Sequence, residues 1–285
     1  MPYIYTSDAY SPREIARRVE EVGVLKAKAR FIETFMLGIL AGGFVGLGGL
    51  LFTFVVATDP GYDVMSLRLL GGVLFASGYI IAILAGTEVF TSNNLLAMAA
   101  ASRRITLRQL LRNWYIVLLA NALGALGLGV LFILSGLQHE LDGAVGQTAY
   151  AVAAEKGNLS IVETFSRAIL GNLFVCIAVW ISLGGRSVTD KVIGAMPPLI
   201  ALGALSLEHV AASLYYLPRG ALIAWLHPEY IDPSLPALTW GTAFLNLGPV
   251  IAGNIIGGSV MVAIVYHLIY GRHHAEESAD RDGQG

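Results

Sequence analysis

Six long apolar stretches divide the sequence, and they restrict the possible fold more than any other feature. Each provides about 20 predominantly apolar residues, which is the length that an α-helix needs to cross the hydrocarbon core of a bilayer. We therefore predict an all-α membrane protein with six transmembrane helices. The predicted spans lie near residues 32–57, 68–101, 113–136, 161–183, 192–217 and 238–270.

Composition agrees with this class and argues against others. Of the 285 residues, 55% are hydrophobic and only 13% are charged, whereas soluble domains carry about 25% charged residues. The net charge of −2 comes without a basic cluster, so we expect no nucleic-acid partner. The single cysteine, Cys176, lies in an apolar stretch and is expected to be a small buried residue rather than half of a disulfide.

Both ends of the chain are polar. We expect residues 1–30 to form a cytoplasmic arm and an amphipathic helix that starts at a capping box, Ser11-Pro12-Arg13-Glu14. This helix would lie on the membrane surface or move beneath a pore. Its predicted apolar stripe consists of Ile15, Val19, Val22 and Leu25. Because these thirty residues lack the apolar core of a signal peptide, the first span is expected to direct insertion. Residues 31–272 would form the transporter domain and 273–285 a disordered cytoplasmic tail.

Basic residues predict the orientation, because the short cytoplasmic flanks of membrane helices are enriched in Lys and Arg. Bases cluster before the first span, between the second and third, and between the fourth and fifth. The opposite loops, 58–67, 137–160 and 218–237, contain only Lys156 and Arg219 as bases. We therefore expect a multi-pass protein of the inner cell membrane with both termini in the cytoplasm.

The second and fifth spans are each interrupted by polar residues that include a carboxylate. Glu88 lies within residues 86–92 and Glu208 within residues 206–209. An ionisable side chain at mid-bilayer costs roughly 2.5–3.5 kcal/mol, so it usually faces protein or a water-filled pathway. Interrupted spans at matching places in two halves are typical of transporters with inverted repeats. We therefore predict a 3+3 inverted repeat with a solute pathway at its pseudo-two-fold axis.

Four motifs around these interruptions resemble those of the formate/nitrite transporter family. They are Gly86-Thr87-Glu88-Val89-Phe90-Thr91-Ser92, Asn172-Leu173-Phe174-Val175-Cys176-Ile177-Ala178-Val179-Trp180, Glu208-His209 followed by Tyr215, Tyr216 and Pro218, and Gly253-Asn254-Ile255-Ile256-Gly257-Gly258. Asn113-Trp114 and Asn121 match as well, so the resemblance covers residues 10–270. It implies an aquaporin-like protomer in a homopentamer, with one pore for small monovalent anions in each protomer.

The resemblance also implies which polar residues line the pathway. Thr91 matches the broken-helix threonine of the family, and His209 matches its central pore histidine. Glu208 matches the partner that holds this histidine, and Asn172 matches the asparagine beside it. Lys156, in the loop before the fourth span, matches the lysine of the outer vestibule.

Apolar residues carry over to the constrictions of the pore, with some departures. Phe75 and Phe90 match family positions on the cytoplasmic side of the pore. Leu202 replaces the usual phenylalanine of the outer constriction, Tyr79 replaces an aliphatic gate residue, and Ser206-Leu207 replaces Gly-Phe. The resemblance therefore leaves the pore width and the transported anion open.

The polar residues suit the chemistry of anion transport. A small anion that crosses an apolar constriction pays a large desolvation cost, which falls if the anion becomes neutral. Histidine titrates near physiological pH, so His209 can supply a proton and take it back. Thr91 can donate its hydroxyl to the anion beside the free amides of a half-helix. We interpret Glu88, Glu208 and Asn254 as structural supports of the broken helices.

The sequence thus predicts transport of small monovalent anions, with formate as the first candidate. Transport would be bidirectional and pH-dependent, and formate/proton symport would explain that dependence. Nitrite and hydrosulfide are the alternatives within the family. A neutral solute is the alternative from another class, although the Asn-Pro-Ala breaks and constriction arginine of a glycerol-type channel are absent.

No enzymatic activity, metal or cofactor is expected. His267 is the other histidine within a span, and no acid–histidine pattern occurs at the spacing of metal ligands. The expected partners are formate, protons, the lipid bilayer and further copies of the chain in a homopentamer.

Overall fold

The computed structural model describes residues 9–57 and 63–271, and in this part of the chain helices are the only regular secondary structure. The first eight residues of the predicted arm and the predicted disordered tail, 273–285, lie outside the described residues. The helices are α1 (Pro12–Lys28), α2 (Phe31–Val56), α3 (Val64–Leu84), η1 (Ser92–Leu95), α4 (Leu96–Ala101), α5 (Leu107–Leu134), η2 (Leu137–His139), α6 (Ala144–Gly157), α7 (Ile161–Gly184), α8 (Val188–Ala204), α9 (Val210–Leu226), η3 (Pro228–Tyr230) and α10 (Trp240–Ile255), which continues as wider helix over Ile256–Ile264 and His267–Gly271.

Five helices in the described part of the chain are long and apolar enough to cross a membrane. They are Phe31–Val56, Val64–Leu84, Leu107–Leu134, Ile161–Gly184 and Trp240–Tyr270. The predicted fifth span is not among them because it consists of two helices, α8 and α9, of 17 residues each. We call residues 85–91, between α3 and η1, the first break, and residues 205–209, between α8 and α9, the second break.

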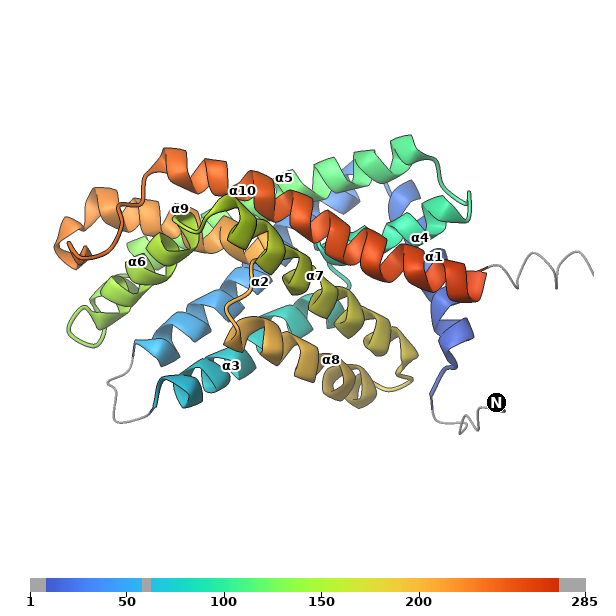
Figure 1. Ribbon diagram of the computed structural model, residues 1–285, viewed down its shortest axis with the longest axis horizontal. Coiled ribbons are helices and arrows are strands. Elements are labelled where there is room, and N and C mark those ends of the chain that lie inside the picture. The colour runs from blue at the N-terminus through green and yellow to red at the C-terminus, as the bar shows by residue number, and fades with distance from the viewer. Residues whose placement is uncertain (1–8, 58–62, 272–285) are drawn as a thin grey trace, which may run out of the picture.

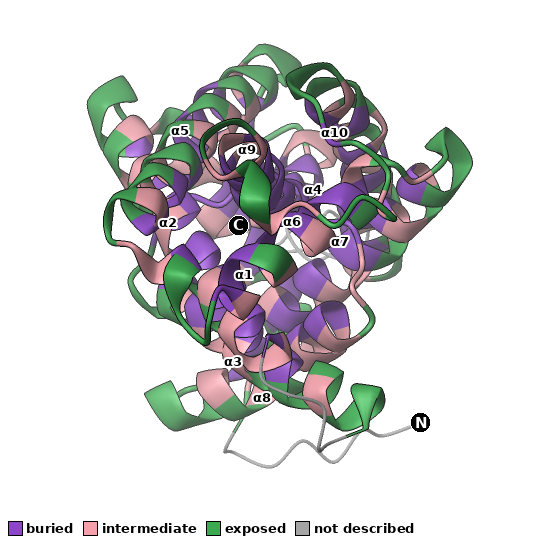
Figure 2. Cartoon of the chain, turned by 90° about the vertical axis from the view of Figure 1, so that its left-hand side faces the viewer, coloured by how far each residue is buried: buried purple, intermediate pink, exposed green. Residues whose placement is uncertain are grey.

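The helices form an elongated bundle with buried residues along its middle. Figure 1 shows α6 and α9 toward one end of the long axis and α1 and α4 toward the other. Viewed along that axis, buried residues occupy the centre and exposed residues face outward (Figure 2). Many outward side chains are large and apolar, among them Leu40, Leu47, Phe244 and Leu245. Such a surface suits contact with lipid or with another protein chain.

Glycines allow neighbouring helices to approach closely, because they place no side chain between the two main chains. A Cβ atom on Gly124 of α5 would lie 1.9 Å from the carbonyl oxygen of Ile39 in α2. The same contact recurs in the second half of the chain. A Cβ atom on Gly257 would lie 2.2 Å from the carbonyl oxygen of Ile169 in α7.

Helix α1 begins as predicted but does not lie free on a surface. The capping box is confirmed, because Ser11 accepts from the Glu14 amide and the Glu14 carboxylate accepts from the Ser11 amide. The predicted stripe is wrong at Leu25, which is 71% exposed. The buried face instead continues through Gly23 and Ala27, because α1 packs against α4 and α7.

The structure corrects two predicted loops. Residues 137–160 contain the buried helix α6, so Lys156 lies on a helix and is only 5% exposed. The fifth span was predicted to end at residue 217, but α9 continues to Leu226. Arg219 is therefore a fully buried helix residue rather than a base in a loop.

Candidate functional site

Asn121 on α5 holds the first break in place. The chain turns at Gly86, whose φ of +67° is the left-handed conformation that glycine adopts readily. The Asn121 amide donates to the carbonyl oxygens of Glu88 and Gly38, each at 2.8 Å, and its oxygen accepts from the Phe90 amide at 2.9 Å. One buried side chain thus pairs main-chain groups that the missing helical turn leaves without partners.

Asn254 does the same for the second break. Its amide donates to the carbonyl oxygens of Glu208 at 3.1 Å and Ala168 at 2.8 Å, and its oxygen accepts from the Val210 amide at 2.9 Å. Here the chain turns at Ser206, with a φ of +51°. The two breaks therefore have matching main-chain partners in the two halves of the chain.

Each break also contains a buried ion pair between a glutamate and a lysine from a preceding helix. Lys26 on α1 lies 3.3 Å from Glu88, and Lys156 on α6 lies 2.8 Å from Glu208. The Glu208 carboxylate also accepts from Ser213 at 3.2 Å. It is thus directed to Lys156 and Ser213, not to the histidine ring that the resemblance assigned to it.

Asparagines fasten both lysine-bearing helices to the bundle. Asn113 donates to the Lys26 carbonyl oxygen at 3.4 Å, and Asn246 donates to the Lys156 carbonyl oxygen at 2.8 Å. Helices α1 and α6 consequently occupy equivalent positions in the two halves of the chain.

A hydrogen-bonded chain of three buried side chains joins the two breaks. His209 Nε2 lies 2.7 Å from Thr91 Oγ1, and the Tyr79 hydroxyl lies 3.1 Å from the same oxygen. His209 Nδ1 accepts from the Ala212 amide at 3.3 Å as the N-cap of α9. In a neutral ring with an accepting Nδ1, the proton resides on Nε2, so His209 donates to Thr91. The site can therefore present a threonine hydroxyl and an imidazole N–H at one point.

Asn172 does not hydrogen-bond to His209. It donates to Asn94 Oδ1 at 2.9 Å and to the Asn254 carbonyl oxygen at 2.6 Å. Asn172 thereby links the helix after the first break to α10. Cys176, one turn further along α7, is buried and lies 3.5 Å from the Thr91 carbonyl oxygen.

Two small cavities lie near the His209–Thr91 pair along the chain, one bordered by Ala212 and the other by Ser92. One, of about 20 Å³, is lined by Phe52, Phe75, Lys156, Leu202, Gly203, Ser206, Leu207, Ala212 and Tyr216. Another, of about 40 Å³, lies between α1 and η1 and includes Lys26 and Asn93 in its lining. A volume of about 20 Å³ holds about one water molecule, so the first cavity is too small for a polyatomic anion.

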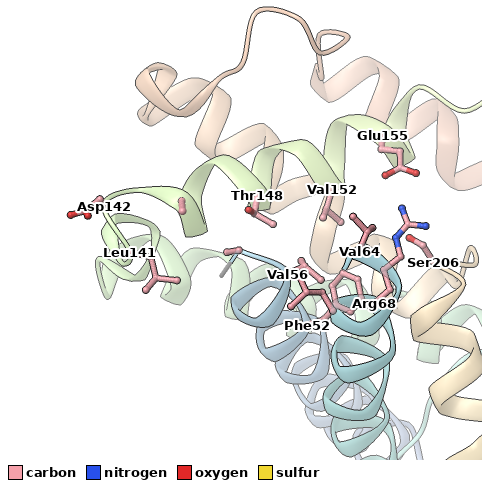
Figure 3. Close-up of a pocket in the computed structure, with 13 residues that line it drawn as sticks. Phe52, Val56, Val64, Arg68, Leu141, Asp142, Thr148, Val152, Glu155 and Ser206 are labelled. Carbon is pink, nitrogen blue, oxygen red and sulfur yellow. The ribbon is translucent and has the colours of Figure 1, made fainter. Parts of the chain in front are cut away.

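The first cavity adjoins a much larger pocket of about 820 Å³. Both are lined in part by Phe52 and Ser206. Figure 3 shows Arg68, Glu155 and Ser206 together toward one side of the large pocket. An opening with charged groups thus leads toward the constriction beside Lys156.

Phe75 lies beside residues that the sequence places at the outer constriction. The resemblance grouped Phe75 with Phe90, but Phe75 lines the same small cavity as Leu202 and Lys156. Phe90 packs edge-on against Trp114, whose indole donates to the carbonyl oxygen of Asn93 near Lys26. Phe75 and Leu202 thus lie together in the wall of one cavity, whose lining does not include Phe90.

Sequence reasoning missed several residues of this site. Lys26 counted only as a cytoplasmic flanking base, and Asn93 and Asn246 received no role. A signal for Lys26 existed in the repeat itself, because Lys26 and Lys156 each precede an apolar stretch that begins a half of the chain.

Known proteins share both the sequence pattern and the fold of this chain. A family model described as formate/nitrite transporter matches residues 13–268. The formate channel FocA of Escherichia coli (strain K12) is 35% identical over 283 residues, covering 94% of this chain and 98% of FocA. The formate channel BtFdhC of Bacillus thuringiensis is 32% identical, with 93% of this chain and 98% of the relative covered.

Solved structures agree with the fold. One described as a pentameric formate channel with formate bound superposes with a TM-score of 0.79 at 31% identity, covering 84% of this chain and 97% of that one. A second, described as an ion channel of the same family, has a TM-score of 0.75 at 23% identity, covering 90% and 98%. The latter likeness concerns the fold alone.

Proposed function

This chain belongs to the formate/nitrite transporter family, and on that premise we propose that it carries formate across the inner cell membrane, with one pathway in each protomer of a homopentamer. The single observation that carries this proposal is the buried His209–Thr91 hydrogen bond, 2.7 Å long, which joins the two breaks. The relatives named as formate channels and the pentameric neighbour support both the solute and the assembly.

We place six spans in the membrane as two inverted repeats. α2, α5, α7 and α10 cross it unbroken, while α3 with α4 and α8 with α9 are the interrupted spans. The recurrence of the Asn121 and Asn254 contacts, and of the two lysine–glutamate pairs, supports this repeat. With both termini in the cytoplasm, Lys26 faces the inner mouth and Lys156 the outer mouth.

The pathway would run from the large pocket through the Phe75–Leu202 constriction to Thr91 and His209, and leave past Phe90. Formate would accept hydrogen bonds from Thr91 and from His209 Nε2–H. If the ring is protonated on both nitrogens, formate takes the Nε2 proton and leaves as formic acid, while the ring becomes neutral. Formic acid crosses an apolar constriction at a much lower desolvation cost than formate.

Protonation of His209 breaks the hydrogen bond by which its ring caps helix α9. A second proton on the ring must sit on Nδ1, which then can no longer accept from the Ala212 amide. Losing an N-cap hydrogen bond costs about 1 kcal/mol. Protonation of His209 is thus coupled to the start of α9, and uptake of formate should rise as the outer pH falls.

Flux into proteoliposomes of the purified protein tests the proposal. Formate, nitrite, hydrosulfide, chloride and glycerol should be compared with and without an inward proton gradient. We expect formate to be carried and to accumulate under the gradient, whereas passage of glycerol or chloride without formate would contradict the assignment.

His209→Asn is the matched variant for the proton step, because asparagine also caps helices but does not titrate. It should keep a passive formate leak and lose accumulation under the gradient. Accumulation by this variant would show that His209 does not carry the proton.

A further inference from the structure

Arg219 is a fully buried cation on α9 that the sequence analysis had placed in a loop. Its Nη1 donates to Thr53 Oγ1 at 3.0 Å and to the Tyr215 hydroxyl at 3.1 Å, and its Nη2 donates to the Ala149 carbonyl oxygen at 3.5 Å. Its Nε has no hydrogen-bond partner. All three acceptors are uncharged.

Within residues 9–57 and 63–271, Arg219 forms no ion pair with a carboxylate. By contrast, Lys26 is paired with Glu88 and Lys156 with Glu208. A lysine–glutamate pair is a dipole whose field weakens quickly with distance, whereas the unpaired guanidinium acts as a full positive charge. The net charge of this part of the interior therefore comes from Arg219.

Aromatic rings surround the guanidinium without neutralising it. Its Cζ lies 4.7 Å from the ring centre of Tyr215, 5.2 Å from that of Phe132 and 5.3 Å from that of Tyr216. Such cation–π contacts offset part of the desolvation cost of a buried cation and leave its charge unchanged.

One of these rings also lines the pathway. Tyr216 borders the small cavity that contains Lys156 and Leu202, and Phe52, adjacent to Thr53, borders it too. The Tyr216 ring therefore lies between Arg219 and this cavity. In a region of low dielectric, a charge at that depth is felt by an ion in the cavity and is little screened by salt.

We propose that Arg219 is the residue that makes the constriction beside Tyr216 favourable to anions, acting as a positioning charge that never contacts the solute. Lys156, whose charge is compensated by Glu208, serves mainly to hold the second break. This inference rests on the proposed function, because it assigns a determinant of anion selectivity to the same pathway.

Formate currents across planar bilayers test the role of the charge, at a pH high enough that His209 stays neutral and formate crosses as the anion. A unit charge about 10 Å from an anion, in an effective dielectric of about 20, changes its binding constant by roughly tenfold. Arg219→Met should therefore raise the half-saturating formate concentration about tenfold. It should also lower the anion-over-cation selectivity that the reversal potential reports in a sodium formate gradient. The maximal current should change much less.

Three further variants separate charge from shape. Arg219→Lys keeps the charge and should stay within about threefold of the unaltered protein. Thr53→Asp keeps Arg219 but supplies the missing carboxylate, so it should weaken formate binding as Arg219→Met does. Thr53→Val removes a hydrogen bond and no charge, and serves as the matched control that should change neither quantity.

The outcomes decide the proposal. Equal losses in Arg219→Met and Arg219→Lys, or unchanged half-saturation in Thr53→Asp, would overturn it. If Arg219→Met does not assemble, the comparison of Thr53→Asp with Thr53→Val decides alone. If the unaltered protein passes no formate, the proposed function fails, and the same variants are then compared by their nitrite currents.

Discussion

Replacing Asn121 by leucine should destabilise the folded protein by about 2–6 kcal/mol. The leucine would leave the Glu88 carbonyl oxygen and the Phe90 amide, two buried groups of the first break, without their hydrogen-bond partner. Each buried main-chain group left unpaired costs about 1–3 kcal/mol. The Gly38 carbonyl oxygen adds less, because it lies within helix α2.

Thermal unfolding of the purified protein in detergent, followed by circular dichroism, measures this loss. Asn254→Leu should cost a similar amount, since it leaves the Glu208 carbonyl oxygen and the Val210 amide unpaired. Asn158→Leu is the matched control, because Asn158 is exposed and donates only to carbonyl oxygens at 2.9 and 3.4 Å. We expect less than about 1 kcal/mol there.

The reasoning is refuted if Asn121→Leu costs no more than Asn158→Leu. That result would mean that the main chain of the first break finds other partners. A difference of several kcal/mol between the two buried asparagines would refute their structural equivalence, even if both variants are destabilised.

Three other predictions concern packing, selectivity and pH. Gly257→Ala places a Cβ atom 2.2 Å from a carbonyl oxygen and should cost about 3 kcal/mol or more, whereas Gly127→Ala, with nothing within 4 Å, should be tolerated in the same thermal assay. Leu202→Phe should reduce lactate flux more than formate flux, because it narrows the constriction; equal reductions would contradict this. Hydrogen bonds from the Ser66 hydroxyl and amide hold the pKa of Asp63 below its ordinary value of 3.8. The start of α3 is therefore fully stabilised above that value and loses the contribution as pH falls through the lowered pKa. The protection of its amides against exchange, relative to the intrinsic rate at each pH, should therefore fall in acid, but not in Asp63→Asn.

Most of the long membrane helices could be predicted from the sequence alone, although α6 and the end of α9 could not. Apolar stretches of about 20 residues demand helices in lipid because the main chain has no other partners there, and the observed α2, α5 and α7 follow the predicted spans closely. The capping box at Ser11 predicted the start of α1, and the polar residues around Glu88 and Glu208 lie in the non-helical segments 85–91 and 205–209. These features depend on neighbours in the chain, so they can be read without tertiary contacts.

Tertiary structure alone decided which side chains meet. Lys156 is a loop base by its sequence context, but its partner Glu208 is 52 residues away, and only the packing of α6 brings the two together. Arg219 is buried because α9 continues beyond residue 217. Phe75 lines the same cavity as Leu202 and Lys156 because the rotation of α3 about its axis depends on the helices beside it. Hydropathy along the chain is a local property. The partner of an ion pair, the burial of a side chain and the cavity that it lines depend instead on contacts between distant segments.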